Sequence, residues 1–207
     1  YQGGTGSLIS MGALRSGLTE EELPEIVERW RGANPAIVQL WYTVEAAAWE
    51  VVRHGRRVAI QEGRLVLARE CDPENGLDFL TIRLPSGRKL YYAHPHEGQN
   101  HFGRPAVCYY GMNQSTKRWE TVETYGGKLV ENITQAAARD CLAEAVERLE
   151  AAGYPVVFHI HDEVVVDAPE GRQSLERVEE IMSRAPDWAP GLPLNADGWV
   201  NPFFKKE

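Results

Sequence analysis

The chain has 207 residues, 43% of them hydrophobic, and a formal net charge of −8 at pH 7. This size allows a buried core in one domain or two small ones, and no apolar run approaches the roughly 20 residues of a membrane span. The acidic balance argues against a surface that binds nucleic acid all over, although a basic groove can coexist with acidic outer helices. Three widely spaced cysteines, at positions 71, 108 and 141, indicate free thiols and a cytoplasmic protein.

The first 57 residues are predicted to be helical. The glycine-rich opening, Tyr1–Gly6, lacks the Gly-Lys-Ser/Thr of a phosphate-binding loop and is interpreted as a turn. Thr19 and Glu22 have the spacing of a capping box. Asn34 and Pro35 are typical of a helix start, and an apolar stripe follows them at helical spacing. Three helices are expected, over residues 8–17, 24–31 and 34–54.

Residues 58–124 change to a period of two, which predicts strands. Pro85-Ser86-Gly87 is a turn between two of them. Pro95, Gly98 and Gly103 indicate a loop after the fourth strand. Six strands are expected, over residues 58–60, 64–68, 79–84, 89–92, 107–112 and 118–124.

That loop suggests one alternative kind of site. His94, His96, His101 and Cys108 are residue types that bind zinc, but their spacing matches no strong zinc signature. A zinc protein built on His94, His96 and Cys108 is therefore kept as a separate hypothesis.

A long helix is predicted over residues 129–152, with Asn132 or a neighbour as its cap and Gly153 at its end. One face is apolar. The offset face carries four polar residues three or four apart, which can line a groove because such spacing places side chains on one side of a helix. They are Lys128, Glu131, Gln135 and Arg139.

A hairpin is predicted over residues 156–167. Val156–Ile160 and Val164–Val166 are interpreted as buried strands, and His161-Asp162-Glu163 as the tight turn between them. Two adjacent acids held by apolar strands are costly to desolvate. A Mg²⁺ ion bound by one or two of the carboxylates would offset this desolvation cost. The alternative is a surface hairpin whose acids face water. A helix capped by Ser174 and an edge strand near Leu194–Val200 complete the expected chain.

The segment 125–140, Tyr-Gly-Gly-Lys-Leu-Val-Glu-Asn-Ile-Thr-Gln-Ala-Ala-Ala-Arg-Asp, followed by Gly153-Tyr154-Pro155 and the hairpin, resembles the C-terminal palm of family A DNA polymerases, particularly the phage branch. Tyr1-Gln2-Gly3-Gly4 resembles the end of that family's nucleotide-binding fingers helix. The resemblance covers the whole chain. It implies an α+β fold, with a helical fingers-base segment over residues 1–57 and a palm over 58–207.

The resemblance also implies roles for individual residues. Asp162 corresponds to a metal-ligating aspartate, and the adjacent Glu163 has a positioning role because it faces the other way. His161 corresponds to a residue that touches the primer terminus, and Gln135 to one that checks base pairs from the minor groove. Tyr1 lies near the templating base. Lys128 and Arg139 are candidates for contacts with DNA phosphates, whereas Glu131 departs from the family's asparagine.

The implied function is template-directed nucleotidyl transfer from deoxynucleoside triphosphates to a DNA primer–template, with two Mg²⁺ ions. The family's other metal aspartate and its triphosphate-binding Arg and Lys precede the position of Tyr1. We therefore expect this chain to be inactive alone and active when joined to an N-terminal polymerase portion. The alternative is a non-catalytic nucleic-acid-binding or assembly module that retains the palm fold.

Overall fold

The computed structural model describes residues 2–169, 171 and 174–205. The fold is α+β, as predicted. It forms two compact units, Tyr1–Thr134 and Gln135–Glu207, and the long helix α4 (Gly126–Ala151) begins in the first and ends in the second. The division into fingers and palm segments at residue 57 stays a prediction. None of the helices in the described ranges combines the length and apolar character needed to cross a membrane.

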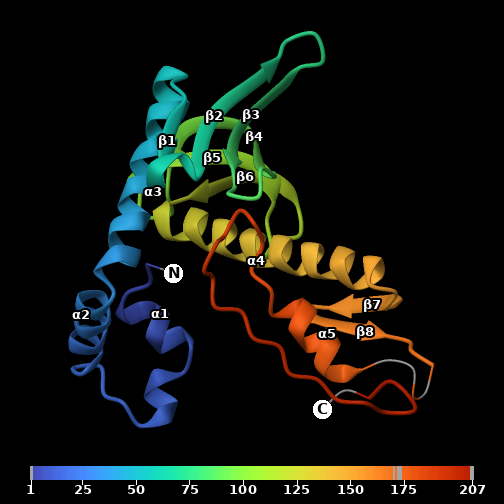
Figure 1. The fold of residues 1–207 in the computed structure, drawn as a ribbon. Helices are drawn as coiled ribbons and strands as arrows, with labels where there is room; N and C mark the ends of the chain where they lie inside the picture. Colours follow the sequence, from blue (N-terminus) through green and yellow to red (C-terminus); the bar gives the residue numbers. More distant parts are fainter. Residues whose placement is uncertain (1, 170, 172–173, 206–207) are drawn as a thin grey trace. The chain divides into compact units, whose positions relative to one another are not determined.

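The first unit joins N-terminal helices to an antiparallel sheet of six strands (Figure 1). The strands follow one another in the sheet in chain order, so every connection is a hairpin. The helices are α1 (Thr5–Ser10), α2 (Leu23–Ala33) and α3 (Pro35–His54), with short 3-10 turns at Ala13–Ser16 and Gln61–Gly63. The strands are β1 (Val58–Ile60), β2 (Leu65–Asp72), β3 (Leu77–Arg83), β4 (Lys89–Gln99), β5 (Pro105–Met112) and β6 (Trp119–Thr124).

The core of this unit lies where α3 packs against the sheet. Val44 and Val51 lie seven residues apart on one face of α3 and are fully buried. Leu67 of β2 and Ile82 of β3 are cross-strand partners and are also fully buried. Burying one such side chain contributes roughly 1.5–3 kcal/mol, so the apolar periodicity of the sequence determines which face of each element points inward.

The predicted loop after residue 92 is wrong, because β4 continues to Gln99. A bulge shifts the register between Ala93 and His96, and His94 there has a φ of +48°. Pro95 lies within this irregularity, where a missing N–H removes no regular ladder bond. Gly98 allows a close approach, since a Cβ on it would lie 2.6 Å from Sγ of Cys108.

Helix α4 begins at Gly126, three residues earlier than predicted, and Asn132 is not its cap. The backbone N–H of Gly127 donates to the side-chain oxygen of Gln2 at 2.7 Å, and that of Gly126 donates to Oε2 of Glu45 at 3.3 Å. An acceptor and a negative charge at a helix N-terminus both stabilise it. Asn132 lies inside the helix and donates to the hydroxyl of Tyr92 on β4 at 3.0 Å.

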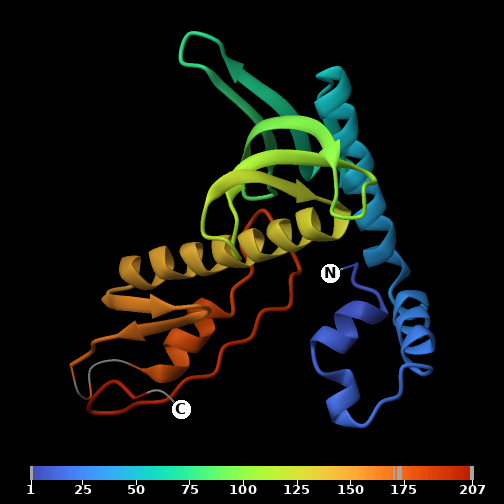
Figure 2. The same cartoon turned by 180° about the vertical axis from the view of Figure 1, so that it is seen from behind.

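The second unit contains the end of α4, the hairpin of β7 (Val156–Ile160) and β8 (Glu163–Val166), and helix α5 (Leu175–Met182), which Figure 2 shows from behind. Its core is a small cluster of Leu149, Tyr154 and Ile181, against which three valines of the hairpin pack. Ser174 caps α5 as predicted, since its hydroxyl accepts from the N–H of Arg177.

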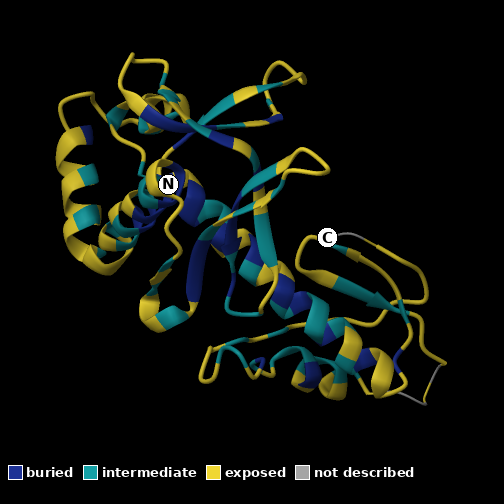
Figure 3. Ribbon diagram, turned by 90° about the horizontal axis from the view of Figure 1, so that it is seen from above, coloured by how far each residue is buried: buried dark blue, intermediate teal, exposed yellow. Residues whose placement is uncertain are grey.

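Two predictions fail in this unit. The hairpin strand β7 is not buried, because Val157 and Phe158 are exposed. Figure 3 colours the chain by burial. A lone two-stranded sheet packed on one side leaves its other side to solvent. Residues 194–200 form no strand, because the backbone N–H groups of Ala196 and Gly198 donate to the side chains of Ser183 and Glu179 instead of to a sheet edge.

Candidate functional site

The hairpin turn is a two-residue loop, because Ile160 pairs with Glu163 across it. His161 and Asp162 are the loop residues, and His161 has a φ of +52°. A positive φ at the first loop position is typical of a type II′ turn, in which glycine is preferred. A histidine there carries backbone strain, and such strain is concentrated at functional positions.

The carboxylates of Asp162 and Glu163 are both exposed to solvent. Within the described ranges neither carboxylate forms a hydrogen bond or an ion pair. The expectation that two acids are desolvated between buried strands is therefore wrong, because the strands flanking the turn are themselves half exposed. Glu163 belongs to β8 and shares the face of Ile160, whereas Asp162 lies in the turn, so the two acids occupy different positions of the hairpin.

Side-chain contacts tie the hairpin to α4. The backbone N–H of Val156 donates to Oε1 of Glu150 at 2.6 Å. Nη2 of Arg139 lies 3.3 Å from Nε2 of His159, the residue of β7 that pairs with Val164. His159 therefore faces the side of the hairpin on which Val164 packs against the core cluster. No signal in the sequence indicated this contact. A bulge after Val156 shifts the register of β7, so simple alternation does not place His159 on the side that faces α4.

The four polar residues predicted to share a face of α4 differ in their partners. Gln135 and Arg139 are exposed and lie four residues apart, one turn of the helix. Lys128, in the first unit, bonds to Oε2 of Glu131 at 2.9 Å. That bond raises the pKa of Lys128, and Glu131 offsets part of the charge available to a phosphate.

Metal binding can be tested against the geometry of the ligands. Carboxylate oxygens suit a hard cation such as Mg²⁺. Nevertheless, the described residues contain no group of three or more His, Cys, Asp or Glu side chains placed to hold a metal ion. Asp162 and Glu163 by themselves therefore do not complete a Mg²⁺ centre.

The described residues also give no support to the zinc hypothesis. His96 contacts the backbone oxygen of His94, His101 contacts Oε1 of Glu123 at 2.6 Å, and Cys108 is buried. These side chains have other partners and do not converge on a common point. Tyr1, the predicted template-side residue, lies outside the described residues.

Comparison with known proteins shows that the chain is similar to a phage protein. Over 208 aligned positions covering the whole chain, the sequence is 51% identical to a DNA polymerase of Bacillus phage SP02. The chain spans 31% of the length of that polymerase. No protein-family model matches the chain, and no solved structure matches it. The predicted resemblance to a phage DNA polymerase is therefore confirmed over the full chain, while the assignment to family A stays a prediction.

Proposed function

We propose that this chain is part of a template-directed DNA polymerase of family A, which acts on a DNA primer–template and deoxynucleoside triphosphates in the phage-infected cell. The similarity to the SP02 polymerase supports the activity, and the hairpin supports the location of the site. The observation that carries the proposal is the carboxylate of Asp162, which has no partner among the described residues and lies in a two-residue turn beside the conformationally strained His161.

The roles follow from position in the hairpin. Asp162 is proposed to supply one carboxylate ligand to Mg²⁺, with the remaining ligands from water, nucleotide phosphates and a second carboxylate elsewhere in the polymerase. When bound, Mg²⁺ activates a primer hydroxyl and stabilises the leaving group. Glu163, on a different face, has the weaker positioning role.

Four further residues are proposed to hold and read the DNA. His161 is proposed to contact the primer terminus from the turn. Arg139 holds the hairpin on α4 through His159, and Gln135, one turn earlier on the helix, would contact the minor groove. Lys128 is proposed as a phosphate contact, in competition with its bond to Glu131.

The test is a chimeric polymerase in which this chain replaces the matching segment of the SP02 polymerase. The Asp162→Ala variant should lower the Mg²⁺-dependent rate of primer extension by about a thousandfold, the equivalent of about 4 kcal/mol of transition-state stabilisation. The matched control is Asp167→Ala, which removes an exposed acid just beyond the same hairpin. Extension by Asp162→Ala within a few-fold of the parent chimera would refute the assignment of the site.

The alternative is a nucleic-acid-binding or assembly module without catalysis, in which the exposed Lys128 and Arg139 contact DNA and Asp162 has no role. It predicts the opposite pattern in the same chimera. Asp162→Ala would leave function intact, whereas Lys128→Gln and Arg139→Gln would weaken DNA binding and reduce its dependence on salt. Fluorescence anisotropy with a labelled primer–template measures both quantities.

A further inference from the structure

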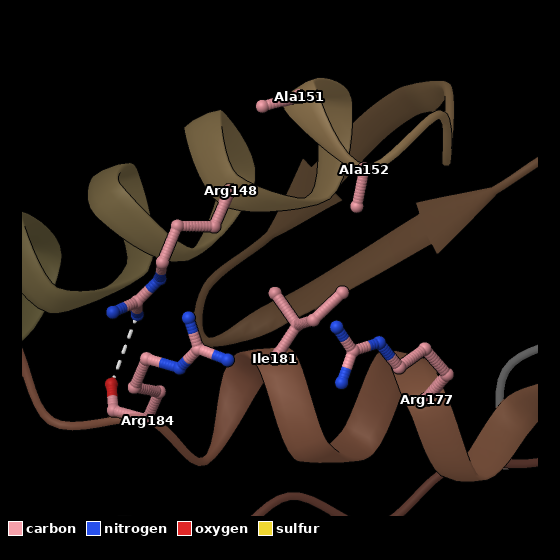
Figure 4. Close-up of a pocket in the computed structure, with 6 residues that line it drawn as sticks. All are labelled: Arg148, Ala151, Ala152, Arg177, Ile181 and Arg184. Carbon is pink, nitrogen blue, oxygen red and sulfur yellow. Dashed lines mark hydrogen bonds between the residues drawn. The ribbon is translucent and has the colours of Figure 1, made fainter.

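A pocket in the second unit gathers three arginine side chains. It lies between the end of α4 and helix α5, has a volume of about 280 Å³, and is lined by Arg148, Ala151, Ala152, Arg177, Ile181 and Arg184. Figure 4 shows the three guanidinium groups directed into the space between the two helices, with Ile181 among them. No candidate residue of the hairpin turn lines this pocket.

Positive charge in the pocket exceeds the negative charge that meets it. Arg177 forms an ion pair with Glu180, the one carboxylate that the described residues pair with any of the three arginines. Glu180 also lies near enough to Arg184 for the arginine to lower its pKa, after the larger effect of Arg177. Three guanidinium groups therefore share a single acid, an arrangement that favours an additional anion because like charges repel at short range.

The hydrogen bonds of Arg148 point to the same conclusion. Its Nη2 donates to the backbone oxygen of Arg184 at 2.9 Å, which holds the two residues together. Its Nε is buried and has no hydrogen-bond partner within the described ranges. A buried donor without an acceptor costs free energy, so the hydrogen-bonding capacity of the Arg148 guanidinium is not satisfied by the protein alone.

A simpler role would be stabilisation of the C-terminus of α4, where basic side chains favour the helix dipole. The backbone already satisfies three of the last four carbonyls of α4. The oxygens of Arg148, Leu149 and Glu150 accept from the N–H groups of Ala152, Tyr154 and Gly153, respectively. Capping therefore does not account for three arginines in one pocket.

We propose that Arg148, Arg177 and Arg184 form a binding site for a phosphate group. Guanidinium groups match phosphate oxygens with paired, charge-assisted hydrogen bonds, and the open pocket admits a group of that size. The phosphate can belong to a nucleic-acid backbone or to free phosphate or pyrophosphate. The site does not depend on the polymerase reaction, so it can be tested by binding alone.

The experiment titrates the 207-residue chain with inorganic phosphate, pyrophosphate and a short DNA duplex, using isothermal titration calorimetry. Arg184→Gln and Arg177→Gln should each weaken binding of the recognised probe by about tenfold, the effect of losing one hydrogen bond to a charged group. Glu180→Gln should tighten it, because the competing carboxylate is removed. Arg29→Gln on α2, whose side chain is 81% exposed, is the matched control and should change nothing.

The three probes distinguish the sources of the phosphate. Weaker binding of phosphate or pyrophosphate in the two pocket variants, with DNA unaffected, assigns the site to free phosphates. Weaker DNA binding with a reduced salt dependence assigns it to the backbone. The proposal is overturned if the pocket variants bind all three probes as the Arg29→Gln control does. Circular dichroism of each variant checks that the chain remains folded.

Discussion

Gly126 provides a sharp test of how α4 is held in place. A Cβ added at this position would lie 2.1 Å from the backbone oxygen of Trp41 and 3.1 Å from Cβ of Glu45. Carbon and oxygen atoms do not approach so closely, and the obstacle is backbone of α3, which cannot rotate away as a side chain can. The Gly126→Ala substitution therefore forces α3 and the start of α4 apart and disturbs the Glu45 contact.

The expected magnitude follows from two opposing effects. Overpacking against a rigid neighbour costs about 1–3 kcal/mol, and this contact belongs at the upper end of that range. Replacing glycine by alanine in a helix returns roughly 1 kcal/mol at most. The net destabilisation is therefore about 2 kcal/mol, and a shift of about 2–4 °C per kcal/mol in a chain of this size predicts a Tm lower by about 4–8 °C.

Gly32→Ala is the matched control. Gly32 lies within α2, and a Cβ there would meet nothing within 4 Å. The same substitution should then stabilise the chain by about 0.5–1 kcal/mol through helix propensity alone. Urea unfolding followed by circular dichroism and tryptophan fluorescence measures both variants. If Gly126→Ala were as stable as the wild type, or Gly32→Ala equally destabilised, steric contact at Gly126 would not be what holds the two helices.

Three further predictions concern single side chains. Burial raises the pKa of Tyr92 to about 12. Subtracting the alkaline absorbance titration of Tyr92→Phe from that of the wild type should therefore show one phenol that ionises near pH 12. Ionisation near pH 10 would contradict this prediction. Because the folded pKa is raised, the stability linked to this phenol is complete below pH 10 and is lost as pH rises through 12. His161→Gly should stabilise the chain by about 1 kcal/mol in urea unfolding, because glycine adopts the left-handed conformation without steric strain. An unchanged unfolding midpoint would mean that His161 is not strained. The Arg69 guanidinium lowers the pKa of Asp78. The ion pair therefore stabilises the β2–β3 hairpin fully at pH values above the ordinary pKa of the carboxyl. This stabilisation is lost as the pH falls through the lowered pKa of Asp78. Hydrogen exchange of that hairpin should lose its acid sensitivity in Asp78→Asn, and identical pH profiles in the two proteins would argue against the pair.

Local sequence patterns predicted those elements whose stability depends on near neighbours. Helix α3 runs over the predicted residues, because Pro35 and Gly55 are residue types that begin and end helices by their own conformational preferences. The β7–β8 hairpin was also located from its valine runs. In both cases the decisive interactions lie within a few residues of one another.

Burial and the contents of the site were not predictable in this way. Runs of valine like those around Asp162 occur both in sheets that are covered on two sides and in sheets that are covered on one. The sequence therefore did not reveal that β7 is exposed. The arginine pocket was missed for a related reason. Arg148 lies on α4 while Arg177 and Arg184 lie on and beyond α5, and no spacing in the sequence relates them.

By itself, the sequence determined the number and order of most elements, the hairpin that presents Asp162, and the likeness to a phage polymerase. Only the tertiary structure decided where α4 begins, because its first N–H groups are satisfied by Gln2 and Glu45, which are 125 and 81 residues away from their partners. The same holds for the extension of β4 through its bulge, which depends on pairing with β5. A backbone group must find an acceptor wherever the fold brings one, and distant acceptors leave no periodic trace in the chain.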